Sequence, residues 1–253
     1  MGMQKITHQD VIKVFDAFKL KDEGQRYLTL HCKRIAYAMN SIREYQKERN
    51  PARVLDIGPH YLTRCIEEFF PDIVIGTLGW KMKGPVLKSS PFCEHIQFDL
   101  NECGPKEITS LRAPYDLIVF SETIEHLYTS PLLVLPELKK LLSPYGSILI
   151  QTPNAASLKS RWKLLMGRHP YEQIRIERSN PGHFREYTLG ELVWYAEATG
   201  FRVRRAEYCN YWEQAHPVAR WIENSVPPLR QGISMLIENC PVIEQPESNA
   251  QER

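Results

Sequence analysis

The stretch Arg53-Val-Leu-Asp-Ile-Gly-Pro59 decides the fold of this chain. Residues 54–57 form an apolar run typical of a buried strand, and Gly58 breaks that run into a turn. The apolar spacing over residues 62–70 then predicts a helix. A strand that ends on glycine before a helix is typical of nucleotide-binding α/β domains. The glycine lets a ligand approach the backbone, and the helix offers unpaired N–H groups.

Strands and helices alternate after this turn. Helices are predicted over residues 131–142, closed by Ser143-Pro144-Tyr145-Gly146, and over 189–199, stopped by Gly200. Mostly apolar strands at this spacing predict an α/β fold with a parallel sheet and helices on both faces. The strand-like runs are residues 53–57, 73–78, 95–100, 116–121, 147–152, 201–208 and 234–240.

Three further segments surround this alternation. Residues 1–50 carry apolar residues at helical spacing and predict an N-terminal helical cap before a main domain of residues 51–244. The tail of residues 245–253 is polar and is expected to be disordered. Residues 155–182 form a basic insertion with an apolar helix face that contains Trp162. We predict that this insertion is a lid; a surface-lying helix near anionic lipid and a helix packed on the core are the alternatives.

The composition excludes several classes of protein. The chain has 253 residues, of which 43% are hydrophobic and 25% charged, with a formal net charge of +2, so composition gives no case for nucleic-acid binding. No apolar run reaches the ~18 residues of a membrane helix, and the N-terminus lacks a secretory signal. Six scattered cysteines without a C-x-x-C pair predict reduced thiols. We therefore expect a cytoplasmic protein without stable membrane insertion.

Five segments in order resemble the class I S-adenosylmethionine (SAM)-dependent methyltransferases. The segment Ser-Glu-Thr-Ile-Glu-His at 121–126 closely resembles the branch that includes the ubiquinone-biosynthesis and the sugar or small-molecule O-methyltransferases. The resemblance covers about residues 30–210 and implies a Rossmann-like seven-stranded sheet whose last strand is antiparallel. It also implies methyl transfer to an oxygen of a small molecule. The five segments are residues 54–58, 98–100, 115–127, 141–154 and 183–188.

The resemblance also implies a cofactor site. The backbone at Gly58 would lie against the methionine part of SAM, while Asp56 would orient the turn or meet the ammonium group. Asp99 would accept the adenine amino hydrogens, although it is also a good helix N-cap. Trp80 could stack on the adenine, and Arg34 of the N-terminal helix could meet the SAM carboxylate. The expected cofactor-binding residues are Arg34, Asp56, Gly58, Pro59, Trp80, Asp99, Leu100 and Ser121.

Two departures from the family pattern stand out. The second and third glycines of the first turn are missing, and Leu78 occupies the position of the carboxylate that binds the ribose hydroxyls. Because leucine cannot accept those hydrogen bonds, either another group holds the ribose or SAM binding is weakened or lost. A non-catalytic scaffold of the same fold is therefore an alternative. A nicotinamide-dependent oxidoreductase is disfavoured, since G-x-G-x-x-G is missing.

The candidate catalytic residues are Glu122, His126 and His183. If a helix begins near Ser121, Glu122 and His126 share a face, and the carboxylate would favour the protonated imidazole. Either histidine could act as general base for a substrate hydroxyl. The ubiquinone-type relatives hold a divalent cation with a similar motif, so Mg²⁺ at Glu122, Glu125 and His126 is a secondary possibility.

Residues 183, 185 and 187 alternate on one side if their segment is extended. His183 and Arg185 could then face the substrate, with Arg185 pairing an anionic group. We expect a small-molecule acceptor: a sugar, a nucleotide-linked sugar or a phenol. The basic insertion slightly favours an anionic acceptor.

Overall fold

The sheet has seven strands in the order β3-β2-β1-β4-β5-β7-β6. The computed structural model describes residues 5–16, 18, 20–80, 92–171, 173–176, 182–212 and 216–240. Strands β1 to β5 pair in parallel, while β7 runs antiparallel to both β5 and β6. The predicted seven-stranded sheet with an antiparallel last strand is confirmed. The strands are β1 (Arg53–Ile57), β2 (Val74–Gly79), β3 (Glu94–Gln97), β4 (Tyr115–Ser121), β5 (Leu142–Pro153), β6 (Phe201–Cys209) and β7 (Gly232–Asn239).

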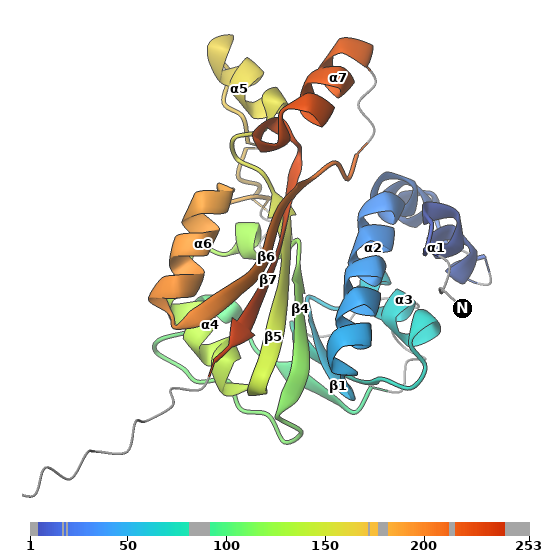
Figure 1. The fold of residues 1–253 in the computed structure, drawn as a ribbon, viewed down its shortest axis with the longest axis vertical. Helices are drawn as coiled ribbons and strands as arrows, with labels where there is room; N and C mark the ends of the chain where they lie inside the picture. Colours follow the sequence, from blue (N-terminus) through green and yellow to red (C-terminus); the bar gives the residue numbers. More distant parts are fainter. Residues whose placement is uncertain are drawn as a thin grey trace, which may run out of the picture.

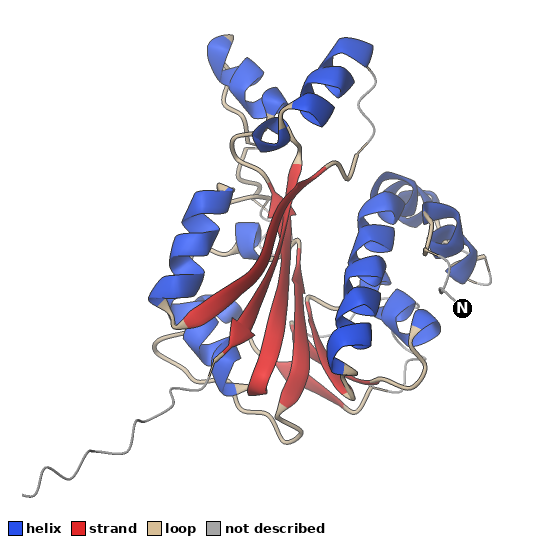
Figure 2. Cartoon of the chain, viewed as in Figure 1, coloured by secondary structure: helices blue, strands red, loops and turns tan. Residues whose placement is uncertain are grey.

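Helices cover both faces of the sheet, as the sequence predicts (Figures 1 and 2). On one face lie α1 (His8–Val14), α2 (Asp22–Arg49) and α3 (Tyr61–Phe69). On the other lie α4 (Pro131–Lys140) and α6 (Leu189–Ala198). Each face has its own buried apolar cluster, because the strands present apolar side chains on both sides. The long helix α2 runs beside the sheet up to the carboxyl ends of its parallel strands (Figure 1).

The turn predicted to close the helix at residues 143–146 lies inside strand β5 instead. Strand β5 begins at Leu142, which pairs with Tyr115, and the register then shifts before Ser147 pairs with Leu117. Tyr145 adopts a left-handed conformation with φ of 62° in this irregularity. The turn signal of the sequence is therefore real, but it marks a bulge in a strand.

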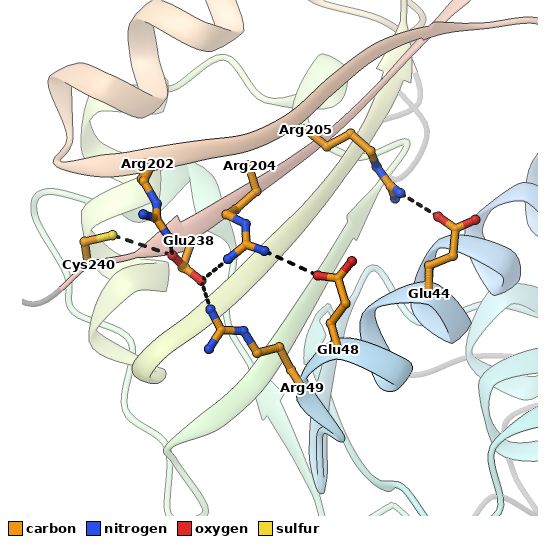
Figure 3. Close-up of polar contacts among 8 residues, drawn as sticks. All are labelled: Glu44, Glu48, Arg49, Arg202, Arg204, Arg205, Glu238 and Cys240. Carbon is orange, nitrogen blue, oxygen red and sulfur yellow. Dashed lines mark hydrogen bonds and ion pairs between the residues drawn. The ribbon is translucent and has the colours of Figure 1, made fainter.

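Ion pairs tie α2 to strands β6 and β7 (Figure 3). The carboxylate of Glu238 in β7 is buried and pairs with Arg49 of α2 at 2.6 Å, with Arg204 of β6 at 3.0 Å and with Arg202. Arg204 also reaches Glu48 of α2 at 3.3 Å. Because Glu238 pairs in register with the early residue Ser147 of β5, this network lies at the edge of the sheet opposite the carboxyl ends of the parallel strands.

Two short helices stand beyond the carboxyl edge of the sheet. They are α5 (Leu158–Leu165), which follows β5, and α7 (Pro217–Ser225), which precedes β7 (Figure 1). Helix α5 belongs to the basic insertion, whose lid function stays a prediction. Residues 245–253, expected to be disordered, lie outside the described residues. Among the helices of the described ranges, none is both long and apolar enough to cross a bilayer. None of the six cysteines, all of which lie in the described ranges, forms a disulfide.

Candidate active site

The turn after β1 is held by a chain of buried hydrogen bonds. Asp56 accepts a bond from the Thr63 hydroxyl at 2.6 Å, and that hydroxyl accepts the His60 N–H at 2.9 Å. Burial raises the pKa of Asp56 to about 7. Gly58 has φ of +72°, and its N–H donates to the Leu78 carbonyl at 2.8 Å. Asp56 is therefore hydrogen-bonded within the turn, and Gly58 adopts a backbone conformation that residues with a side chain rarely adopt.

The expected adenosine-binding residues divide into buried and exposed side chains. Leu78 is fully buried and packs in the core cluster. Trp80, directly after β2, keeps 48% of its surface exposed and is open to a stacking partner. Asp99 caps the 3-10 helix η1 (Leu100–Glu102) by accepting the N–H of Asn101 at 2.9 Å. Leu100 packs in the core and offers a ligand only its backbone.

Arg34 of α2 is buried at the end of β4. Its Nη1 donates to the Ser121 hydroxyl at 2.8 Å, and its Nη2 donates to the hydroxyl of Tyr27 at 3.3 Å. The Ser121 hydroxyl in turn donates to Gln151 at 3.0 Å. The Nε of Arg34 is buried with no partner among the described residues. Helix α2 thus places a cation at the end of β4, and the contact of Arg34 with SAM stays a prediction.

The segment after β4 differs from the prediction. No helix begins at Ser121: Glu122 adopts a left-handed conformation with φ of 49°, and only the 3-10 helix η2 (Ile124–His126) follows. Glu122 and His126 therefore do not share a helix face, and that expectation was wrong. The backbone reversal instead turns two acids inward. Burial raises the pKa of Glu122 to about 8, and burial also raises the pKa of Glu125.

Glu125 links this segment to the one that follows the insertion. Its Oε2 accepts the Thr152 hydroxyl at 2.9 Å, and its backbone carbonyl accepts the N–H of Phe184 at 2.9 Å. Its Oε1 and the Oε1 of Glu122 are buried without a partner among the described residues. These two atoms and the Arg34 Nε are the positions that a bound polar ligand would satisfy, because buried polar groups are otherwise nearly always paired.

The two candidate bases lie side by side with opposite protonation preferences. The rings of His126 and His183 are 4.8 Å apart. His126 Nδ1 lies 2.8 Å from the Gly182 carbonyl, and a carbonyl can only accept, so Nδ1 carries the proton and Nε2 is the basic atom. Burial lowers the pKa of His126. The expected protonated His126 beside Glu122 was therefore wrong, because desolvation outweighs the neighbouring carboxylate.

His183 is paired with a carboxylate that the sequence interpretation missed. Its Nδ1 lies 2.9 Å from Glu186 Oε1. Burial opposes the charged ring, but Glu186 and Glu125 outweigh burial and raise the pKa of His183. The signal was present in the His-x-x-Glu spacing, which can bring the two side chains together in a tight turn. A carboxylate on Nδ1 leaves Nε2 of the neutral ring as the proton acceptor.

Arg185 and Tyr187 do not join this cluster. Arg185 pairs with Glu191 at the start of α6 and lies over the ring of Tyr187, which is buried. The segment is a loop, so the alternation expected of an extended chain does not hold. Of the three residues, only His183 reaches the site, and Arg185 is committed to a structural ion pair.

A cavity of about 940 Å³ opens beside the N-terminal half of α2. Its lining includes Arg26, Leu30, Lys33 and Trp212, but none of the acids or histidines described above. Tyr211 connects the two regions, because it lines the cavity and its hydroxyl accepts a bond from Gln151 Nε2 at 3.3 Å.

Comparison with known families identifies the domain. A family model described as "Methyltransferase domain" matches residues 25–206, which is most of the chain. The chain belongs to this methyltransferase family. The match confirms the predicted enzyme class and, at the level of the family, its SAM cofactor. No curated protein matches this methyltransferase.

Solved structures agree on the fold. The pyocyanin biosynthetic protein PhzM is 16% identical with a TM-score of 0.55, and the match covers 92% of this chain but 62% of PhzM. The plantazolicin methyltransferase BpumL, solved with a desmethyl plantazolicin analog and SAH, is 14% identical with a TM-score of 0.56, covering 92% and 94%. A SAM-dependent methyltransferase from Archaeoglobus fulgidus is 19% identical with a TM-score of 0.50, covering 81% and 94%. At these identities the likeness shows the fold alone.

The residues of this methyltransferase fit Mg²⁺ poorly. Glu125, His126 and His183 offer donor atoms that lie within 4.8 Å of one another. This set contains two imidazoles and one carboxylate, whereas the sequence interpretation proposed Glu122, Glu125 and His126. Mg²⁺ demands oxygen ligands in near-octahedral geometry, while imidazole suits later transition metals. The magnesium expectation is therefore not supported.

Proposed function

We propose that this methyltransferase transfers the methyl group of SAM to an oxygen atom of a small molecule. Within the family we group it with the ubiquinone-type and sugar O-methyltransferases, on the strength of its 121–126 motif. The observation that carries the proposal is the His183–Glu186 pair beside His126, at the carboxyl edge of the sheet. Ligands of open α/β sheets bind at this edge.

His183 is the proposed general base. Glu186 accepts a hydrogen bond from Nδ1–H of His183, so the lone pair of Nε2 faces the acceptor. Nε2 takes the hydroxyl proton while the acceptor oxygen attacks the methyl carbon. When bound, SAM would supply an electrophilic methyl group with a neutral thioether as its leaving group. His126 stays neutral because burial lowers its pKa, so it can accept a hydrogen bond from the acceptor through Nε2. The pair thus combines one stronger base with one neutral positioning group.

Four residues are proposed to hold the cofactor. Gly58 lets the backbone approach the methionine part, and Asp56 keeps that turn in place. The unpartnered Nε of Arg34 suits a carboxylate, and the unpartnered Oε1 of Glu122 suits an ammonium group, whose charge would favour the ionised form of this buried acid. This division differs from the sequence interpretation, in which Asp56 was the candidate for the ammonium group, because the Asp56 carboxylate already accepts from Thr63.

The acceptor is proposed to be a small, preferably anionic molecule. The basic insertion, with Lys159, Arg161 and Lys163, favours an anionic acceptor. A sugar, a nucleotide-linked sugar and a phenol all stay open as acceptor classes.

Calorimetry with SAM and S-adenosylhomocysteine, followed by an acceptor screen that detects S-adenosylhomocysteine release, tests this function. We expect His183→Ala to lower kcat by ~10²–10⁴-fold while SAM affinity stays within about threefold. His216→Ala, which removes an exposed histidine outside the site, is the matched control and should keep full turnover.

Glu186→Gln gives a sharper readout. Since Glu186 raises the pKa of His183, its loss should move the acidic limb of the pH–rate profile to lower pH while the plateau rate falls. Normal turnover in His183→Ala would remove the general-base role. Folded protein that binds no SAM would instead support the alternative of a non-catalytic scaffold.

A further inference from the structure

Helices α5 and α7 expose large apolar side chains at one end of the molecule. On α5, Trp162 is 61% exposed and Leu165 76% exposed, and Met166 follows at the end of the helix. On α7, Val218 and Trp221 are also exposed. The spacings 162, 165, 166 and 218, 221 put each set on one helix face. Two such faces beyond the edge of the sheet make an apolar surface, in contrast to the single exposed apolar residues that most protein surfaces carry.

The same region carries an excess of positive charge. Over residues 155–182 and 211–232 the sequence has eight lysine and arginine residues against four glutamates, of which Glu223 is buried. Arg161, Lys163 and Arg230 donate to backbone carbonyls, which carry no formal charge, so the region stays positive. The eight cations of these two segments are Lys159, Arg161, Lys163, Arg168, Arg175, Arg178, Arg220 and Arg230. The whole chain, in contrast, has a net charge of only +2.

We propose that the α5–α7 surface docks on an anionic lipid bilayer. Exposed tryptophan and leucine on short helices, flanked by arginine and lysine, match the chemistry of the membrane interface. The apolar faces would enter the headgroup boundary while the cations contact anionic headgroups. Such docking is peripheral, in keeping with the described helices being too short or too polar to span a bilayer.

A second copy of this chain fits the surface less well. In a twofold dimer the same patch meets itself, so two regions that each carry an excess of four positive charges would face one another. Nucleic acid would meet the positive charge but leave the tryptophan, leucine and methionine faces exposed to water. A bilayer satisfies both the charge and the apolar surface.

The docking proposal does not depend on the identity of the acceptor. Both helices stand beyond the edge that carries His126 and His183, because β5 ends and β7 begins there (Figure 1). Docking would therefore bring the carboxyl edge of the sheet toward the bilayer. SAM binding and vesicle binding can be measured separately on the same protein.

Flotation of the full chain with vesicles tests the proposal. We expect binding to phosphatidylcholine vesicles that contain about one quarter phosphatidylglycerol, with little binding to phosphatidylcholine alone. Raising the salt from about 50 to 500 mM should weaken binding, since the Debye length shrinks. The double variant Trp162→Ala/Trp221→Ala should lower the partition coefficient at least about tenfold.

Trp194→Ala is the matched control, because Trp194 is a 56%-exposed tryptophan on α6 and lies outside this surface. It should bind vesicles like the wild type. Failure of the wild type to float with anionic vesicles, or unchanged flotation of the double variant, overturns the proposal. A concentration-dependent dimer that the double variant abolishes, without vesicle binding, would assign the surface to a second copy instead.

Discussion

Glu238→Gln should destabilise the fold without touching the site. The carboxylate side chain is 1% exposed and accepts bonds from Arg49, Arg202 and Arg204 (Figure 3). Glutamine keeps the shape of the side chain but removes its charge. Because Glu238 joins α2 to β6 and β7, the change weakens the connection between the N-terminal helical cap and the antiparallel part of the sheet.

The size of the effect follows from how exposed the partners are. A hydrogen bond to a charged group contributes about 1.5–3 kcal/mol when both groups are buried. The three arginine side chains are 31%, 38% and 58% exposed, so water competes for them. The contribution of each bond to stability is therefore closer to the ~0.2–1 kcal/mol of surface pairs. The sum for Glu238 is about 2 kcal/mol. At ~2–4 °C per kcal/mol for a chain of this size, Tm should drop by roughly 4–8 °C.

The pH dependence supplies an internal check. Burial alone would raise the pKa of Glu238, but Arg202, Arg204 and Arg49 outweigh it, so the folded pKa lies below the ordinary 4.5. The stabilisation is thus fully present above pH 4.5 and is lost as the pH falls through the folded pKa. Wild type and variant should converge at low pH in denaturant titrations.

Glu44→Gln is the matched control for this experiment. Glu44 pairs with Arg205 in the same region, but its side chain is 57% exposed, so its loss should have a much smaller effect. Equal Tm changes in the two variants, or a wild-type advantage over Glu238→Gln that is unchanged at pH 3, would refute the reasoning.

Two further predictions concern the turn after β1. Gly58→Ala should weaken SAM binding at least about tenfold, because φ is +72° and the new Cβ would lie 3.0 Å from the Thr123 hydroxyl; Gly190→Ala, which meets nothing within 4 Å in α6, should bind normally. Asp56→Asn should flatten the pH dependence of stability between about pH 4 and 7. There the folded carboxyl, with its pKa of about 7, holds a proton that the unfolded chain has lost, so wild-type stability falls as the pH rises. Parallel unfolding profiles of wild type and Asp56→Asn would contradict this second prediction.

Sequence patterns were sufficient to predict the sheet because its strands are buried on both faces. The apolar runs that end at Ile57, Ser121 and Thr152 lie in β1, β4 and β5. Their order and spacing leave few ways to build a parallel sheet. The bulge at Tyr145 was not predictable, because a turn signal looks the same at a helix end and inside a strand. Strand pairing across the sheet decides between them, and that information is not local.

The sequence named candidate site residues but not the contacts between them. Gly58 lies in the turn after β1, as predicted, since a strand end fixes the position of the next residue. The helix expected at Glu122 depended on assuming regular structure where the backbone takes a left-handed turn. The partner Glu186 was missed because its role comes from a contact between side chains in a loop, and periodicity carries no information there.

The two histidines show why charge states have to be read from packing. Sequence proximity put a carboxylate next to His126 and predicted a protonated ring. In the fold His126 instead meets a carbonyl and loses solvent, while His183, farther along the chain, gains Glu186. Two protonated imidazoles 4.8 Å apart would repel each other. The environment that keeps one ring neutral therefore favours the protonated form of the other. The neutral ring of His126 lowers the cost of charging His183, and in the proposed function this asymmetry makes His183 the base.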